Sequence, residues 1–400
     1  MQPRIDDHVH NRLRVLKAIR RAEPVSRTEL AELTGLAPAT ITEVVGDLSR
    51  RKLLLSEKRS TGGKGRPRIA LRLNPDAAYV VGVTTGFSNS TQVDIVNARG
   101  DKLFTKTFKY ARGKSLVARA ERIATWIEKV IAASPYPKSA IHSVGLAEPA
   151  MVDSVRGVLH WLVTYPPHPT PMAALIRKRL GLPVFVDNEF NVYARAEHWF
   201  GDGRQLDDFT VIGIGLSVSL AQYVDGRMWT GGHGINAEFS HTKVLMGEGR
   251  RCVCGAKDCL VTYCSMHGIV SKAAAARNVD MREVPAVIDA FHGLAKEARA
   301  GNRAVRKVFE QAGTVFGIAV ANYINLSNPR RITILAMDAV MREMIEPWFA
   351  TAVKENTLPV LRDLVPIDWK VLDSATYAKG TAALVLEQLY RVPDRPRGHT

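Results

Sequence analysis

The chain has 400 residues, of which 46% are apolar and 24% charged, so it can bury a sizeable core and is not disordered as a whole. Its 55 Lys and Arg against 39 Asp and Glu give a net charge of +16, which favours a polyanionic partner. No run of about 18 apolar residues appears, and Met1 is not followed by an apolar signal core. These features predict a cytoplasmic protein of two or three domains with no membrane partner.

The positive charge is concentrated near the N-terminus. Residues 1–76 have a net charge of +7, and residues 50–72 contain nine basic residues against the single acid Glu57. We therefore expect the polyanion-binding surface in this part of the chain.

Two helices are predicted before residue 35. Leu13, Leu16 and Ile19 have the spacing of one amphipathic face. Ser26 and Glu29 form a Ser-x-x-Glu capping box, which is typical of a helix start. A short second helix should therefore begin at this point.

A third helix is predicted after the break at Gly35. Pro38 suits the first helical turn, and apolar residues follow at helical spacing at Ile41, Val44, Val45 and Leu48. Helix, short turn and helix is the helix-turn-helix arrangement, in which the last helix enters the major groove of DNA. The residues expected to reach the bases are Ala39, Thr40, Thr42 and Glu43.

A basic wing is predicted behind the third helix. The apolar runs 53–55 and 69–71 flank a Gly-rich segment, which indicates a hairpin. Its basic residues, expected to contact phosphates or the minor groove, are Lys64, Arg66 and Arg68. The alternative is a three-helix module that contacts protein, but the local charge and the wing favour a double-stranded DNA operator.

All four cysteines fall in one short segment. Cys252, Cys254 and Cys259 form a C-x-C-G-x-x-x-C pattern, and His241 lies eleven residues upstream. Three thiolates and one imidazole complete the closed tetrahedral shell of a structural zinc site, so one zinc ion per chain is predicted. Cys264 is a possible substitute ligand, although a buried apolar role is favoured.

Several segments together resemble the ROK family of repressors, open reading frames and sugar kinases. Residues 65–67 end the wing as Gly-Arg-Pro, and residues 181–191 are similar to the family segment G-[IL]-P-V-x-V-E-N-D-x-N. Residues 237–241 resemble G-E-x-G-H, and the cysteine cluster resembles C-x-C-G-x-x-G-C-L-E. The similarity extends over nearly the whole chain.

The resemblance implies an α/β fold with two domains. Residues 1–76 would form a winged helix-turn-helix domain, and residues 77–400 a two-lobed, actin-like (ribonuclease H-like) ROK domain with a zinc knuckle around 241–259. The patterning agrees: strands are predicted at 79–84, 91–96 and 103–108, before a helix with Leu116, Ile123, Ile127 and Val130 on one face. A second copy is indicated by strands at 209–216 and 220–224, a helix at 305–326 and a strand at 331–335.

The segments that bind nucleotide in the family's kinases are altered. The first phosphate loop, D-x-G-G-T in those kinases, falls at residues 84–88 and lacks the carboxylate. The second loop at residues 213–219 lacks its later glycines, and Met337 replaces a glycine on the adenosine side. Three such changes predict that the chain does not use ATP and is not an enzyme.

The sugar side is altered less. The resemblance places sugar contacts at Asn188, Glu189, Glu238 and His241, with Glu189 standing where the kinases have their catalytic Asp. Val261 replaces the family's Glu after Cys-Leu, which implies a changed specificity. Structural roles for Asn188 and Glu238 at loop ends are the alternative.

These observations predict a transcriptional regulator, a repressor of carbohydrate uptake or catabolism genes, that acts as a homodimer or tetramer and responds to a sugar or polyol. Closure of the lobes around the sugar would change the geometry of the DNA-binding domains. The main alternative is an active ATP-dependent sugar kinase that also regulates transcription. A constitutive DNA-binding protein, control by a protein partner and direct sensing of zinc are further alternatives.

Overall fold

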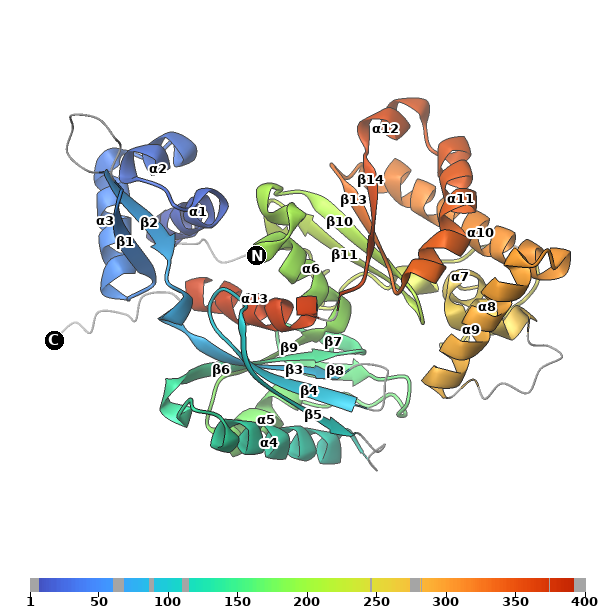
Figure 1. Ribbon diagram of the computed structural model, residues 1–400, viewed down its shortest axis with the longest axis horizontal. Coiled ribbons are helices and arrows are strands. Elements are labelled where there is room, and N and C mark those ends of the chain that lie inside the picture. The colour runs from blue at the N-terminus through green and yellow to red at the C-terminus, as the bar shows by residue number, and fades with distance from the viewer. Residues whose placement is uncertain are drawn as a thin grey trace.

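The computed structural model describes residues 7–59, 68–85, 90–109, 115–244, 247–273, 281, 283–373 and 375–391. These residues form a small N-terminal unit and two larger α/β lobes, with the helix α13 lying between the N-terminal unit and the lobes (Figure 1). None of the helices in the described part of the chain is long and apolar enough to cross a membrane.

The N-terminal unit contains the three helices and the hairpin that the sequence predicts. Its elements are α1 (Asp7–Ala22), α2 (Arg27–Thr34), α3 (Pro38–Arg50), β1 (Leu54–Arg59) and β2 (Arg68–Leu73). The predicted capping box is present, because the Ser26 hydroxyl accepts a hydrogen bond from the Glu29 N–H and the Glu29 carboxylate accepts one from the Ser26 N–H. Gly35 ends α2 in the left-handed conformation, with φ at 63°.

The first lobe is built on a five-stranded sheet of order β5-β4-β3-β6-β9. Strands β3, β6 and β9 are parallel, β4 runs antiparallel to β3, and β5 runs antiparallel to β4. The polar, largely exposed strand β5 forms one edge, which discourages edge-to-edge aggregation. The strands and helices of this lobe are β3 (Tyr79–Thr85), β4 (Ser90–Val96), β5 (Lys102–Lys109), α4 (Leu116–Ala133), β6 (Ile141–Glu148), β7 (Met151–Asp153), β8 (Val158–Trp161), α5 (Met172–Leu180) and β9 (Val184–Asn188).

The second lobe repeats this topology. Its sheet has the order β12-β11-β10-β13-β14, again with two antiparallel pairings followed by two parallel ones. The duplication predicted from the strand pattern is therefore confirmed. The strands and helices are β10 (Phe209–Ile214), β11 (Val218–Val224), β12 (Arg227–Met228), α7 (Val261–Cys264), α8 (Met266–Ala273), α9 (Val284–Arg299), α10 (Arg303–Ser327), β13 (Ile332–Ala336), α11 (Ala339–Asn356), α12 (Pro359–Leu364) and β14 (Ile367–Val371).

Two helices join the lobes and the N-terminal unit. Helix α6 (Glu189–Phe200) leaves the first lobe after β9, and α13 (Ala375–Arg391) returns from the second lobe to pack on the first sheet (Figure 1). The two helices touch so closely that a Cβ at Gly380 of α13 would collide with the carbonyl group of Val192 in α6. The two helices are therefore closely packed.

The N-terminal unit shares its hydrophobic core with this helix pair. Val15, Leu16 and Ile19 of α1 belong to the same buried cluster as Trp199 of α6 and Leu386 of α13. A displacement of α6 or α13 therefore acts directly on α1.

Candidate functional site

The first candidate surface is the outer face of α3. Ile41, Val44, Val45 and Leu48 are buried in the N-terminal unit, and the opposite face of the helix is exposed. Of the four residues predicted to contact bases, Ala39, Thr42 and Glu43 are exposed and Thr40 is half-buried. Lys64 and Arg66 lie outside the described residues, and of Arg68 only the backbone is described, in β2.

The second candidate is a pocket between the lobes. Ala150, Val152, Asn188 and Asn191 form the wall from the first lobe and α6, and the second-lobe wall contains Val218, Ser219, Leu220, Ile235, Asn236, Ala237, Glu238 and Ser240. The cavity measures about 40 Å³, which is room for about three water molecules.

Two of the four predicted sugar contacts lie in these walls. Asn188 is held by its own hydrogen bonds, since its Nδ2 donates to the Ala150 carbonyl at 2.9 Å and its Oδ1 caps α6 at the Phe190 N–H. Desolvation raises the pKa of the Glu238 carboxyl group. Glu189 and His241 are not among the lining residues.

Asn236 is a pocket residue that the sequence did not indicate. Its amide nitrogen donates to the Asn191 side chain and to the Leu220 carbonyl at 3.2 Å. Its Oδ1 is buried and has no partner among the described residues. An unsatisfied buried acceptor in a pocket wall is suited to a ligand hydroxyl.

Glu189, at the first position of α6, is half-buried. Burial, and secondarily the charge of Glu148, raises its pKa to about 8. At neutral pH the carboxyl group is therefore largely protonated, and it can donate a hydrogen bond but is a poor proton acceptor.

Glu189→Gln is expected to change the pH dependence of stability. Because the folded-state pKa of about 8 lies above the ordinary 4.5, the contribution of this group is complete below about pH 4.5 and is lost as the pH rises through about 8. Thermal unfolding of both proteins should be measured between about pH 5 and pH 8.5. The Tm of the variant is expected to rise relative to that of the wild type as the pH increases. Glu310→Gln, on the exposed side of α10, is the control, and a constant Tm difference for Glu189→Gln would contradict the assignment.

The third candidate is a cluster of metal-ligating side chains. One atom each of His241, Cys252, Cys254 and Cys259 lies within 4.8 Å of the others. His241 Nδ1 is 3.5 Å from Cys252 Sγ, and the sulfurs of Cys254 and Cys259 are 3.6 Å apart. Ligands around a tetrahedral zinc ion stand about 3.6 Å (N to S) and about 3.8 Å (S to S) apart. The donor set and its spacing therefore fit a metal ion.

The loop that carries the cluster is held from several sides. Asp258 accepts hydrogen bonds from the Arg250 N–H at 2.8 Å and from the Tyr263 hydroxyl, and the Arg250 guanidinium lies 4.0 Å above the Tyr263 ring. Lys243 donates to Cys259 Sγ at 2.8 Å and so brings a positive charge to the thiolates. Cys264 is fully buried, and the four-residue cluster does not include it.

The pocket and the cluster share one short turn. Glu238 immediately precedes the 3₁₀ turn Phe239–His241, and the His241 N–H donates to the Glu238 carbonyl at 3.0 Å. A displacement of Glu238 would therefore also displace His241.

On the nucleotide side, Met337 packs against the second loop. A Cβ at Gly215 would lie 2.7 Å from the Met337 Cβ, and the Met337 N–H donates to the Ile214 carbonyl at 2.9 Å. Of the first loop, residues 86–88 lie outside the described part.

The model of the ROK family matches residues 81–387, which is more than half of the chain. The chain belongs to the ROK family. Its curated relatives extend beyond the family domain to include the N-terminal unit. The xylose repressor of Caldicellulosiruptor bescii is 22% identical over 389 residues, covering 96% of this chain and 97% of its own. The DNA-binding transcriptional repressor Mlc of Escherichia coli is 24% identical over 382 residues, covering 94% and 92%.

Solved ROK structures confirm the predicted fold class. A ROK family transcriptional regulator, a homologue of the Escherichia coli Mlc protein, has a TM-score of 0.77 at 25% identity and covers 96% of this chain and 97% of its own. A ROK family glucokinase from Streptomyces griseus, in complex with glucose and AMPPNP, has a TM-score of 0.60 at 21% identity, covering 77% and 99%. At that identity the kinase supports the fold alone.

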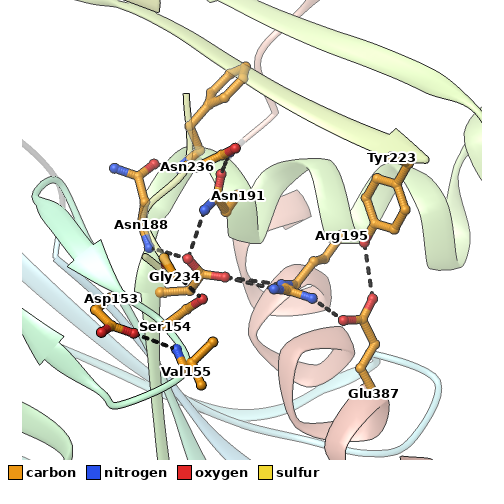
Figure 2. Close-up of polar contacts among 12 residues, drawn as sticks. Asp153, Ser154, Val155, Asn188, Asn191, Arg195, Tyr223, Gly234, Asn236 and Glu387 are labelled. Carbon is orange, nitrogen blue, oxygen red and sulfur yellow. Dashed lines mark hydrogen bonds and ion pairs between the residues drawn. The ribbon is translucent and has the colours of Figure 1, made fainter. Parts of the chain in front are cut away.

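A buried polar network behind the pocket is the main feature that sequence reasoning missed (Figure 2). Asp187 binds Asn191 and Arg195, and Arg195 also binds Glu387 of α13. Asp187 on β9 and Arg195 on α6 are eight residues apart, and Glu387 is 192 residues further along the chain than Arg195. Nothing in the local sequence joins them.

Proposed function

We propose that this ROK protein is a DNA-binding transcriptional repressor whose operator affinity is controlled by a sugar or polyol bound between its lobes. The observation that carries the proposal is the exposed outer face of α3, together with the strongly basic sequence of residues 50–72. Relatives named as repressors cover this unit as well as the family domain, which supports the same reading. Residues 1–76 would bind DNA and residues 77–400 the effector.

The effector chemistry proposed is that of a neutral polyhydroxyl compound. The pocket offers the amide groups of Asn188 and Asn236 and the carboxyl group of Glu238 to ligand hydroxyls. The unsatisfied Asn236 Oδ1 can accept a hydrogen bond from one of them. Glu189 would contribute as a protonated acid, and His241 by linking the ligand to the metal loop. Relatives named for xylose and for N-acetylglucosamine support a monosaccharide, and the regulated genes would then concern carbohydrate uptake or catabolism.

We infer that the domain has no phosphoryl-transfer activity. Glu189, at the position of the kinases' catalytic Asp, is largely protonated at neutral pH, and Met337 fills space beside Gly215. The kinase alternative draws on the shared fold of the Streptomyces griseus glucokinase. Sugar-dependent ATP consumption by the purified protein would favour that alternative.

The metal proposed for the His241, Cys252, Cys254 and Cys259 cluster is one structural zinc ion. Four protein ligands close the shell, so the ion would stabilise the loop and leave no position for a substrate. We also propose a homodimer or a dimer of dimers, because two symmetric α3 helices read a pseudo-palindromic site.

The test of DNA binding is the salt dependence of affinity for a duplex selected from a random-sequence pool. Replacing Arg66 and Arg68 by Ala is expected to weaken binding and to reduce the slope of log K against log salt by about two, since each lost phosphate contact removes about 0.9. Arg177→Ala with Lys178→Ala, exposed on α5, removes the same charge from the first lobe as a control. An unchanged slope in the wing variant would contradict the wing's role, and failure to select any duplex would contradict DNA binding itself.

A further inference from the structure

A continuous chain of buried polar contacts runs from the pocket to the N-terminal unit. It begins at the pocket wall, where Asn236 donates to Asn191 and Asn191 donates to Asp187 Oδ1 at 2.8 Å. Arg195, two turns along α6, donates to Asp187 Oδ2 at 2.8 Å. The pocket end of α6 is thus tied to its middle by ion pairing and hydrogen bonds.

Glu387 of α13 receives the other end of this chain. Its carboxylate accepts from Arg195 on one oxygen, and from the Trp199 indole N–H and the Tyr223 hydroxyl, both at 3.0 Å, on the other. Arg195 and Tyr223 appear on either side of Glu387 in Figure 2. One buried carboxylate therefore holds the middle of α6, the end of α6 and the second-lobe strand β11.

The last link reaches α1. The guanidinium of Arg20 lies 4.6 Å above the Trp199 ring, and one of its nitrogens is 3.5 Å from His198 Nε2. Arg20 and His198 are both buried, and each has a nitrogen, Arg20 Nη1 and His198 Nδ1, with no hydrogen-bond partner among the described residues. A junction with unsatisfied buried donors is held less firmly than a saturated one, so small displacements of Trp199 can alter it.

Arg195 also has room to change its contacts. A cavity of about 220 Å³ lies beside it, lined by Ser154, Phe185, Thr230, Leu384 and Gln388 among others. Because Val155, which also lines it, is exposed, the cavity opens toward solvent, and it leaves space into which the long Arg195 side chain can move.

We propose that Glu387 is the positioning residue that couples the sugar pocket to the DNA-binding unit, through the relay Asn236–Asn191–Asp187–Arg195–Glu387–Trp199–Arg20. The relay would transmit sugar binding to the DNA-binding unit, and this inference rests on the repressor function proposed above. When a ligand hydroxyl engages Asn236, the hydrogen bonds of Asn191 and Asp187 rearrange, and Arg195 changes its hold on Glu387. Trp199 then shifts under Arg20, and α1 moves with it.

The relay is tested in the full chain without DNA or sugar by hydrogen–deuterium exchange of α1. Asn191→Ala, at the pocket end, is expected to change the exchange rates of α1 by about threefold or more relative to those of α4. The change should disappear when Trp199→Phe, which removes the indole donor to Glu387, is also present. If Trp199→Phe does not fold, Arg20→Gln interrupts the relay at its next link.

Glu197→Gln is the matched background. Glu197 lies on α6, is 8% exposed like Glu387, and is ion-paired to Lys370 at 2.8 Å outside the relay. The effect of Asn191→Ala on α1 should persist in this background and vanish with Glu387→Gln. An equal effect in all backgrounds, or no effect in the wild type, would overturn the relay. Failure to bind DNA or sugar in separate assays would instead count against the proposed function.

Discussion

Cys252→Ser is expected to abolish stoichiometric metal binding and to destabilise the second lobe strongly. The substitution leaves three of four ligands in a closed shell, and the free energy of binding a structural zinc ion is also free energy of folding. In zinc-finger peptides that binding is worth about 10–16 kcal/mol, so loss of even part of it exceeds the effect of most single substitutions. Metal content by elemental analysis and the thermal unfolding curve measure the two effects.

Cys264→Ser provides the control for this experiment. Cys264 is a buried cysteine outside the cluster, with its thiol against the Leu260 carbonyl at 3.4 Å. The control variant should retain one metal ion per chain. If Cys252→Ser also retained it, the proposed ligand set would be wrong.

Arg195→Met is expected to lower the free energy of unfolding by about 3–5 kcal/mol. Arg195 is buried and paired with two buried carboxylates, Asp187 and Glu387, and its removal leaves both without their cation. Denaturant unfolding of the full chain measures the loss. The expected cost is large because the unpaired charges cannot reach water without opening the packing of α6 against α13.

Arg179→Met is the matched comparison. Arg179 forms a two-pronged pair with Glu128 at 2.7 and 3.1 Å, but both side chains are about 40% exposed or more. Its loss should cost about 1 kcal/mol or less, because water solvates the partner that remains. An equal loss in the free energy of unfolding for the two variants would mean that the buried ion pairs of Arg195 stabilise the fold no more than an exposed pair does.

The local patterns predicted most of the fold. The structure contains the capping box at Ser26, the buried apolar face of α3 and the predicted strands of both lobes. Each of these features depends on residues that are close together in the chain. The cysteine cluster could also be predicted from the sequence, since three of its ligands lie within eight residues and the fourth, His241, is close upstream.

The arrangement behind the pocket was not predictable in this way. Asn236, Arg195 and Glu387 are polar residues with no distinctive spacing, and what gives them significance is burial beside partners on other elements. The same holds for the docking of α1 on Trp199, which depends on how α13 returns across the first lobe. The pKa of Glu189 likewise follows from tertiary burial and from Glu148, which lies at the end of β6.

The central claim is that a sugar bound between the lobes controls DNA affinity. The most direct measurement is the affinity for a selected duplex with and without D-xylose, D-glucose or N-acetyl-D-glucosamine, in the wild type and in Glu238→Ala. We expect at least one sugar to weaken wild-type binding by about tenfold, a coupling of about 1.4 kcal/mol, and to have little effect on the variant. The claim would be contradicted if the wild type bound the duplex equally well with and without every sugar. It would also be contradicted if sugar weakened DNA binding by the Glu238→Ala variant as much as by the wild type.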